Sequence, residues 1–304
     1  MKDQNHTQMP TGRDIPLLLI GIIGIGTSGP IIALSVMPVF ILIFWRNIAG
    51  SILMLPFAIK AKEWRSAEHR NGIAFAIVAG LALSLHFVGF FYAMRLTSVA
   101  TGTALAAMQP IFAALFVTFF GGVIPRRAWI GMFISFAGVV LITGIDFQLS
   151  TRAFIGDLAA IACGAMSAIY VMIGSHAQRK ISTSTYTSIC YLSCAVSVLP
   201  LIYFNKYKLI DYSRYQWMLL FFLFLGAQVM GHTMFNFTLK RVSPTVVSLI
   251  VFFEVPVCAI LAFWWLDQVP PAAVIPGIIL ILIGCGIFVM RSKPLAENNI
   301  NPVA

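Results

Sequence analysis

The sequence has few charged residues. Asp, Glu, Lys and Arg make up only 10% of its 304 residues, whereas a soluble globular domain carries about 25%. The uncharged stretches are long: 31 residues lie between Asp14 and Arg46, and 30 lie between Arg95 and Arg126. A transmembrane helix needs about 20 apolar residues. The scarcity of charge therefore argues against a soluble domain and predicts a protein that crosses the membrane several times.

Motifs for metals, nucleotides and redox chemistry are also missing. The five cysteines form no CxxC pair and no cluster with histidine, so the usual zinc and redox motifs are excluded. The sequence contains neither an HExxH motif nor a P-loop, which are signatures of many metalloproteases and nucleotide-driven proteins. We therefore expect no cofactor and no metal, and we do not predict an enzyme.

Apolar residues are abundant. They make up 60% of the chain, and the mean hydropathy is +0.92. The pattern predicts an all-α polytopic membrane protein with ten transmembrane helices. The predicted helices are Ile15–Ala33, Val36–Ile59, Gly72–Met94, Val99–Phe120, Trp129–Ile145, Ala153–Ile173, Ser184–Phe204, Gln216–Thr238, Pro244–Trp265 and Pro271–Met290.

The formal net charge of +10 indicates loop anchors on one face of the membrane, and we expect no nucleic-acid partner. Ten helices place both termini on one side, where fourteen Lys and Arg residues gather, against five on the other. The positive-inside rule makes that side the cytoplasm, so we expect a protein of the inner membrane. The fourteen are Lys2, Arg13, Lys60, Lys62, Arg65, Arg70, Arg126, Arg127, Arg179, Lys180, Lys240, Arg241, Arg291 and Lys293.

An internal repeat relates the two halves of the chain. The segment "LTSVATGTALAAMQPIF" begins at residue 96, and "RVSPTVVSLIVFFEVPV" begins at residue 241. Ser98 precedes Gln109 by eleven residues, and Ser243 precedes Glu254 by the same eleven. The offset of 145 residues pairs Gln109 with Glu254, so the two side chains are expected at corresponding places.

Glycines extend this repeat into the last helix of each half. Gly131 and Gly138 are seven residues apart, and so are Gly277 and Gly284. Five helices per half is an odd number, so the halves have opposite orientations, as in many secondary transporters. The predicted parts are a cytoplasmic tail at 1–14, repeats at 15–145 and 153–290, and a second cytoplasmic tail at 291–304.

These motifs resemble the drug/metabolite transporter superfamily, and specifically its ten-helix EamA-type members. The resemblance rests on "FWRNIAG", "FVGFFYAMRLTSVATGTALAAMQPIFAAL", "GDLAAIACGAMSAIYV" and "FTLKRVSPTVVSLIVFFEVPVCAI", and it covers about residues 15–290. The family commonly has Glu-Pro in the fourth helix, where this chain has Gln109-Pro110. The resemblance implies a secondary transporter that exports small organic metabolites, such as amino acids or related compounds, with a site between the repeats.

Glu254 is a carboxylate inside an apolar helix. It lies ten residues past Pro244, or about 15 Å along the helix, where an ionised acid costs at least ~2.5–3.5 kcal/mol. We interpret it as a group that binds substrate or a coupling proton, and the alternative is an acid that only bridges helices. Pro256 removes a backbone hydrogen bond beside it, as Pro110 does beside Gln109, and both prolines are expected to kink their helices.

Other polar residues complete the predicted site. Gln228, His232 and Asn236 are four residues apart and form one polar stripe, either along a cavity or as a hydrogen-bond ladder between helices. Arg46 is a counter-charge for a substrate or for Glu254, or else a packing residue. The weaker candidates are His86 and Tyr92.

Two other functions fit single features of the sequence. Gly26–Gly29 reads GTSG, the GxSG of intramembrane serine proteases, with Ser28 as nucleophile and His232 as base. Those proteases carry the motif in a later span, and a motif outside its structural context is weak evidence. A channel or receptor is the remaining alternative, but alternating access explains an inverted repeat better. The expected partners are a small-molecule substrate, the lipid bilayer and protons as the candidate coupling ion.

Overall fold

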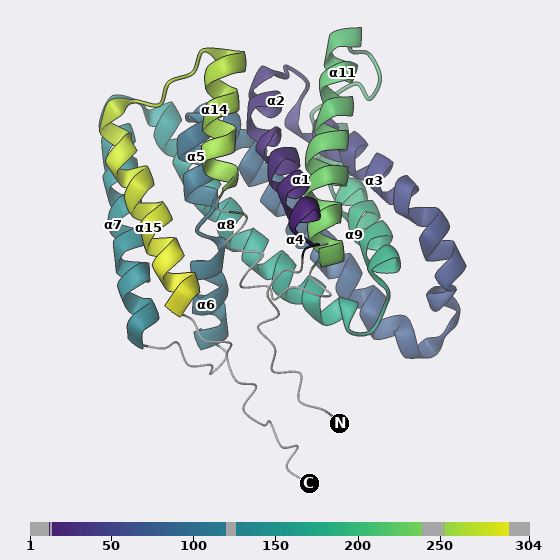
Figure 1. Ribbon diagram of the computed structural model, residues 1–304. Helices are drawn as coiled ribbons and strands as arrows, with labels where there is room; N and C mark the ends of the chain where they lie inside the picture. The colour runs from purple at the N-terminus through teal and green to yellow at the C-terminus, as the bar shows by residue number, and fades with distance from the viewer. Residues whose placement is uncertain (1–11, 13, 120–125, 239–250, 252, 292–304) are drawn as a thin grey trace.

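All regular secondary structure in the described part of the chain is helical, and no strand occurs there (Figure 1). The structure is a computed structural model that describes residues 12, 14–119, 126–238, 251 and 253–291. The α-helices are α1 (Asp14–Gly26), α2 (Ser28–Leu34), α3 (Val39–Ala61), α4 (Arg70–Leu96), α5 (Val99–Ala106), α6 (Gln109–Phe119), α7 (Arg126–Leu149), α8 (Thr151–Gln178), α9 (Thr183–Ser197), α10 (Leu199–Phe204), α11 (Arg214–Leu223), α12 (Met234–Thr238), α14 (Glu254–Leu266) and α15 (Ile275–Arg291). The other helices are the 3-10 helices η1 (Glu63–Arg65), η2 (Ala67–His69) and η4 (Ala272–Val274), and the π-helix η3 (Phe224–Thr233).

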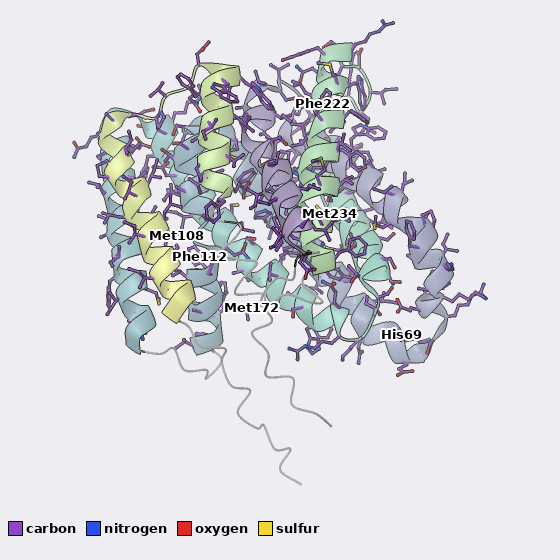
Figure 2. The ribbon with its side chains drawn as sticks, in the orientation of Figure 1. His69, Met108, Phe112, Met172, Phe222 and Met234 are labelled. Carbon is purple, nitrogen blue, oxygen red and sulfur yellow. The ribbon has the colours of Figure 1, made fainter. Side chains whose placement is uncertain are left out.

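Eight helical segments are long and apolar enough to cross a membrane, so the chain is a multi-pass membrane protein. Two further apolar helices, Glu254–Leu266 and Ala272–Phe288, are shorter. Ser243 and the first part of the predicted helix Pro244–Trp265 lie outside the described residues. The predicted tails also lie outside them, except for residues 12, 14 and 291. Large apolar side chains cover the outer surface, among them Phe222, which is 49% exposed (Figure 2). Such a surface is typical of contact with lipid.

Several predicted spans are interrupted where a continuous helix was expected. The first divides into α1 and α2 at Thr27, and the fourth divides into α5 and α6 at residues 107–108, where Met108 lies (Figure 2). Pro110 lacks an N–H and its ring clashes with the carbonyl four residues earlier. The break in the fourth span therefore falls immediately before this proline. Pro256 lies in the first turn of α14, and the helix that would precede it is outside the described residues.

Helices α7 and α15 pack closely along the four glycines of the repeat. A Cβ atom on Gly131 would lie 2.4 Å from the Gly284 carbonyl oxygen, and one on Gly138 would lie 2.6 Å from the Gly277 carbonyl oxygen. Only residues without a Cβ permit this approach. Because Gly131 corresponds to Gly277 and Gly138 to Gly284, each helix meets its counterpart in reverse order. The two helices are therefore antiparallel.

Corresponding helices of the two halves make the same contacts. α4 of the first half packs along α8 of the second. The counterpart of α4 is η3, and it packs in the same way along α1. α3 packs against α9, and α5 against α14. Figure 1 shows α7 with α15 at one side of the molecule and α3 with α9 at the other. The halves thus meet along a central interface.

At each end of the molecule, a side chain of one half holds the start of a helix in the other. The Glu63 carboxylate accepts hydrogen bonds from Ser182 N at 2.9 and 3.0 Å and from Ser182 Oγ at 2.8 Å, just before α9. At the opposite end, Gln216 Oε1 accepts from Ser35 Oγ at 2.7 Å and from the next two backbone N–H groups at 3.0 and 3.3 Å. We call these the Glu63 end and the Gln216 end.

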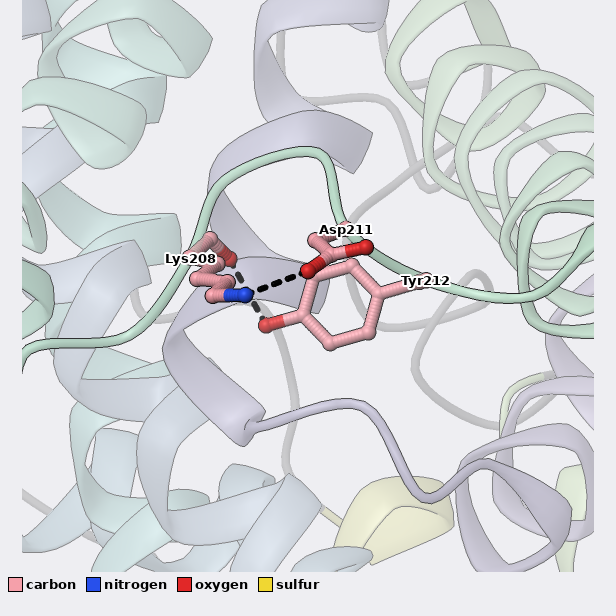
Figure 3. A network of polar contacts seen from close by, with 3 residues as sticks. All are labelled: Lys208, Asp211 and Tyr212. Carbon is pink, nitrogen blue, oxygen red and sulfur yellow. Dashed lines mark hydrogen bonds and ion pairs between the residues drawn. The ribbon is translucent and has the colours of Figure 1, made fainter.

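An exposed polar network lies in the loop before α11, at the Gln216 end (Figure 3). Lys208 Nζ is 2.5 Å from Asp211 Oδ2, and Tyr212 OH donates to the Lys208 carbonyl oxygen at 2.7 Å. The hydrogen bond to Asp211 raises the pKa of Lys208, and the same bond lowers the pKa of Asp211. Exposed pairs of this kind stabilise a fold little.

Candidate functional site

A cavity of about 150 Å³ lies between the two halves. Helices α1 to α6 line it from the first half, and α8, η3, α12 and α14 line it from the second half. A buried water needs about 10–15 Å³, so the cavity has room for a small organic molecule in place of several waters. Its polar lining residues are Ser28, Arg46, His86, Thr103, Gln109, Ser167, Tyr170, His232, Asn236 and Glu254.

Glu254 and Gln109 both line this cavity. Each is the first residue of its helix, α14 and α6. The Glu254 carboxyl forms a side-chain hydrogen bond with Ser28 of the first half. The Gln109 Oε1 accepts a hydrogen bond of 2.7 Å from Ser167 Oγ of the second half. A serine of the opposite half therefore positions each of the two repeat-related side chains.

Arg46 is almost fully buried beside the cavity. Its Nε donates to Gln228 Oε1 at 2.5 Å, and its guanidinium carbon lies 4.2 Å from the ring centroid of Phe87. One terminal nitrogen, Nη2, has no hydrogen-bond partner. In the described residues no ion pair joins Arg46 to Glu254. A buried guanidinium with an unused donor is suited to binding an anionic group.

The predicted polar stripe is only partly formed. His232 and Asn236 line the cavity, but Gln228 is fully buried and bonded to Arg46. The prediction of one continuous α-helix is wrong here, because Phe224–Thr233 is a π-helix. A π-helix closes its backbone hydrogen bonds over five residues rather than four. The side-chain Oγ1 of Thr233 also donates to the Gln228 carbonyl, five residues earlier, at 2.8 Å. The spacing of an α-helix therefore does not describe the orientation of these side chains.

Only one of the two weaker candidates lines the cavity. His86 lines the cavity, and its Nδ1 is 3.2 Å from the Cys163 carbonyl oxygen. Tyr92 does not line it, since its ring packs edge-on against Phe40 at a centroid distance of 6.2 Å. Pro110 lines the cavity and Pro256 does not. The aromatic ring of Phe87 contacts that of His232, its counterpart in the repeat, at 5.6 Å.

The sequence did not indicate Ser167, Tyr170 or Thr103. Serine, tyrosine and threonine are common in membrane helices, and only the contact with Gln109 distinguishes Ser167. The sequence indicates Ser28 only as the nucleophile of a protease. The structure joins it to Glu254, and among the described residues no hydrogen bond joins it to His232. The residues described also contain no group of three His, Cys, Asp or Glu that could hold a metal.

These features define a multi-pass helical membrane protein with a polar cavity between two similar halves. The chain belongs to the EamA-like transporter family, whose sequence profile matches residues 13–144 and again residues 154–290. The chain is thus a transporter by family, as the resemblance in the sequence implied.

Two sequence relatives and one solved structure are similar to this chain. An uncharacterized transporter of Archaeoglobus fulgidus is 24% identical over 86% of this chain and 91% of its own length. The pseudopaline exporter CntI of Pseudomonas aeruginosa is 26% identical over 86% of this chain and 89% of its own length. A crystal structure of a protein with 19% identity matches 94% of this chain and 100% of that chain with a TM-score of 0.61, which supports the fold.

Proposed function

We propose that this protein is a secondary transporter that exports a small organic metabolite, such as an amino acid or a related compound, by alternating access. The observation that carries the proposal is the shared cavity of Glu254 and Gln109, each bonded by a serine of the other half. Sites of secondary transporters with inverted repeats lie at this kind of interface. Export is the direction named for the relatives from Pseudomonas aeruginosa.

The proposed topology has ten membrane-spanning helices in two inverted repeats, at residues 15–145 and 153–290. The antiparallel contact of α7 with α15 supports the inversion, because corresponding glycines meet in reverse order. The excess of Lys and Arg supports a cytoplasmic location for both termini in the inner membrane. The Glu63 end is then cytoplasmic and the Gln216 end faces outward.

In the proposed mechanism Glu254 changes its charge during the cycle. A neutral carboxyl crosses the closed state without the cost of an unpaired charge in the membrane. An ionised carboxylate binds a proton or a substrate ammonium group when the cavity is open. Gln109 offers a similar amide oxygen to its serine but cannot titrate, so the charge cycle belongs to the second half alone.

Arg46 is the proposed partner for a substrate carboxylate. Its Nη2 is buried without a partner, while its Nε is fixed by Gln228. His86, His232 and Asn236 add hydrogen-bonding groups on the cavity wall. The apolar rings of Phe87 and Phe90 accept the non-polar part of a substrate. A cavity with one cation and one acid suits a molecule that carries both kinds of charge.

Counterflow in proteoliposomes tests this proposal. Purified protein is reconstituted, loaded with an unlabelled metabolite from a panel, and assayed for uptake of the same labelled metabolite. A transporter gives saturable accumulation, and the Ser28→Ala variant should retain it. A serine protease would lose its activity in this variant, because Ser28 would be its nucleophile. Arg46→Met should reduce accumulation of carboxylate-bearing substrates selectively. Flux that fails to saturate, in the manner of an open channel, would overturn the proposal.

A further inference from the structure

Two carboxyl groups outside the transport cavity are buried together where α7 and α8 meet. Asp146 is 5% exposed and Asp157 is 0% exposed. A side-chain hydrogen bond joins the two carboxyl groups, and Thr97 Oγ1 donates to Asp146 Oδ2 at 3.4 Å. Asp146 belongs to the last helix of the first half, and Asp157 belongs to the first helix of the second.

The backbone brings these groups together. A Cβ on Gly156 would lie 2.7 Å from the Thr97 backbone nitrogen, so α8 can approach the α4–α5 link only through a glycine. The turn between α7 and α8 is short, because Ser150 N donates to the Asp146 carbonyl at 2.8 Å and Ser150 Oγ caps α8. The position of the pair is therefore set by tight packing and not by a flexible loop.

No cation of the described residues compensates the pair. Besides Asp146, Thr97 is the side chain of the described residues that offers Asp157 a hydrogen bond, and no nitrogen donor of those residues reaches either oxygen of Asp157. The charged groups at this end of the surrounding helices are Arg95 on α4, Arg152 on α8 and Asp267 after α14, and α5 carries none. The Arg95 guanidinium donates to two carbonyls of α2 and the link after it, and Arg152 donates to the Arg95 carbonyl. Both arginines are therefore engaged elsewhere.

A hydrogen bond between two carboxyl groups needs a proton, because an ionised carboxylate is only an acceptor. Two ionised carboxylates side by side in the interior would also repel each other. We infer that Asp146 and Asp157 hold one proton between them, in a second proton site that lies at the junction of the halves.

This site is close to solvent at the Gln216 end. Thr97 lines a polar cleft of about 690 Å³ together with Arg95, Arg152 and Asp267. A movement that separates α8 from the α4–α5 link would break the Thr97 contact and connect the two carboxyl groups to this cleft. The pair then releases its proton on the side that we propose to be outside the cell. Proton release would thus accompany opening of that end.

Infrared difference spectroscopy on the full-length protein tests the inference. The background is Glu254→Gln, so that the carboxyl of the transport cavity contributes no signal. A rise in pH should remove one carboxylic-acid band, with release of about one proton per chain. Asp157→Asn supplies an amide donor in place of the proton, so the band and the proton release should both disappear while the fold is kept. Asp211→Asn, an exposed carboxylate, is the matched control and should change neither.

Thermal unfolding against pH gives a second readout. At neutral pH the folded pair keeps a proton that an aspartate of the unfolded chain, with an ordinary pKa of about 3.9, has already lost. The melting temperature should therefore fall as the pH rises. This slope should be flatter in Asp157→Asn and in Asp146→Asn. A band and a slope that are the same in Asp157→Asn as in its parent, or that change equally in Asp211→Asn, would overturn the inference. A shift of the band with sodium at constant pH would also overturn it in favour of a metal cation.

Discussion

Glu254 and Gln109 occupy corresponding places in the two halves, and a serine of the opposite half contacts each of them. The scaffold around them is nearly the same, because both begin a helix beside one cavity. They differ by a single functional group, since a carboxyl can lose a proton and an amide cannot. The comparison suggests that symmetry supplies the position of the site while the departure from symmetry supplies its charge.

The largest expected effect comes from removing that difference. Glu254→Gln makes the two sites chemically alike, and the fold should tolerate it because the glutamine retains a bond to Ser28. Net transport driven by a pH gradient should fall by roughly tenfold or more, the effect of about 1.4 kcal/mol. Counterflow, which needs no net charge movement, should persist. An unchanged pH profile of net transport would show that Glu254 is a packing residue.

The comparison is sharpened by moving the acid to the other half. Gln109→Glu in the Glu254→Gln background places a carboxyl next to Ser167 at the corresponding position. If the two places are equivalent, part of the pH dependence of net transport should return, measured in the same proteoliposomes. Ser167→Ala added to this double variant removes the hydrogen bond and should reduce the recovery. A double variant that behaves like Glu254→Gln alone would show that the surroundings of the two sites differ functionally.

The repeat could be read from the sequence because similar residues recur at a nearly constant offset. An offset of 145 residues pairs Gln109 with Glu254, and an offset of 146 pairs Gly138 with Gly284. Both pairs lie at corresponding places in the fold. Hydropathy located the helices because a run of about twenty apolar residues is long enough to cross the hydrocarbon core of a membrane. These signals are local or periodic, so one chain is enough to reveal them.

The rest of the site depends on contacts that a periodic pattern cannot carry. The π-helix at residues 224–233, which packs along α1, changes which side chains of a stripe face the cavity. Ser167 matters because of one distance to Gln109, and Gln228 because of one distance to Arg46. Asp146 and Asp157 are eleven residues apart in the sequence, and only the turn between α7 and α8 brings them together.

Alanine substitutions at two glycines of α7 should have smaller effects on stability, with a loss at one position and no loss at the other. A Cβ on Gly138 meets the Gly277 carbonyl oxygen at 2.6 Å, whereas a Cβ on Gly144 meets nothing within 4 Å. Gly138→Ala should therefore lower the free energy of unfolding by about 1–3 kcal/mol, as overpacking does. Gly144→Ala should be neutral, or stabilising by up to about 1 kcal/mol through helix propensity. Melting temperatures of the purified variants measure both, and equal losses at the two positions would contradict the close contact of α7 with α15.

The smallest effect compares the two ends, where Glu63 and Gln216 hold helix starts with an acid and an amide. Partial burial raises the pKa of Glu63, but hydrogen bonds from Thr185 and Ser182 outweigh it, so this pKa lies below its ordinary value of 4.5. A group with a lowered pKa contributes stability above its ordinary value, and that stability is lost as the pH falls through the folded pKa. The parent should therefore lose stability on acidification below about pH 4.5, by less than about 1 kcal/mol because the residue is partly exposed to solvent, which screens the interaction. Glu63→Gln should remove this part of the acid sensitivity, while Gln216→Glu should introduce a new pH dependence at the other end.

Thermal unfolding scans at a series of pH values compare the three proteins. A Glu63→Gln variant with the acid slope of the parent would show that the carboxylate at this end acts only as a hydrogen-bond acceptor.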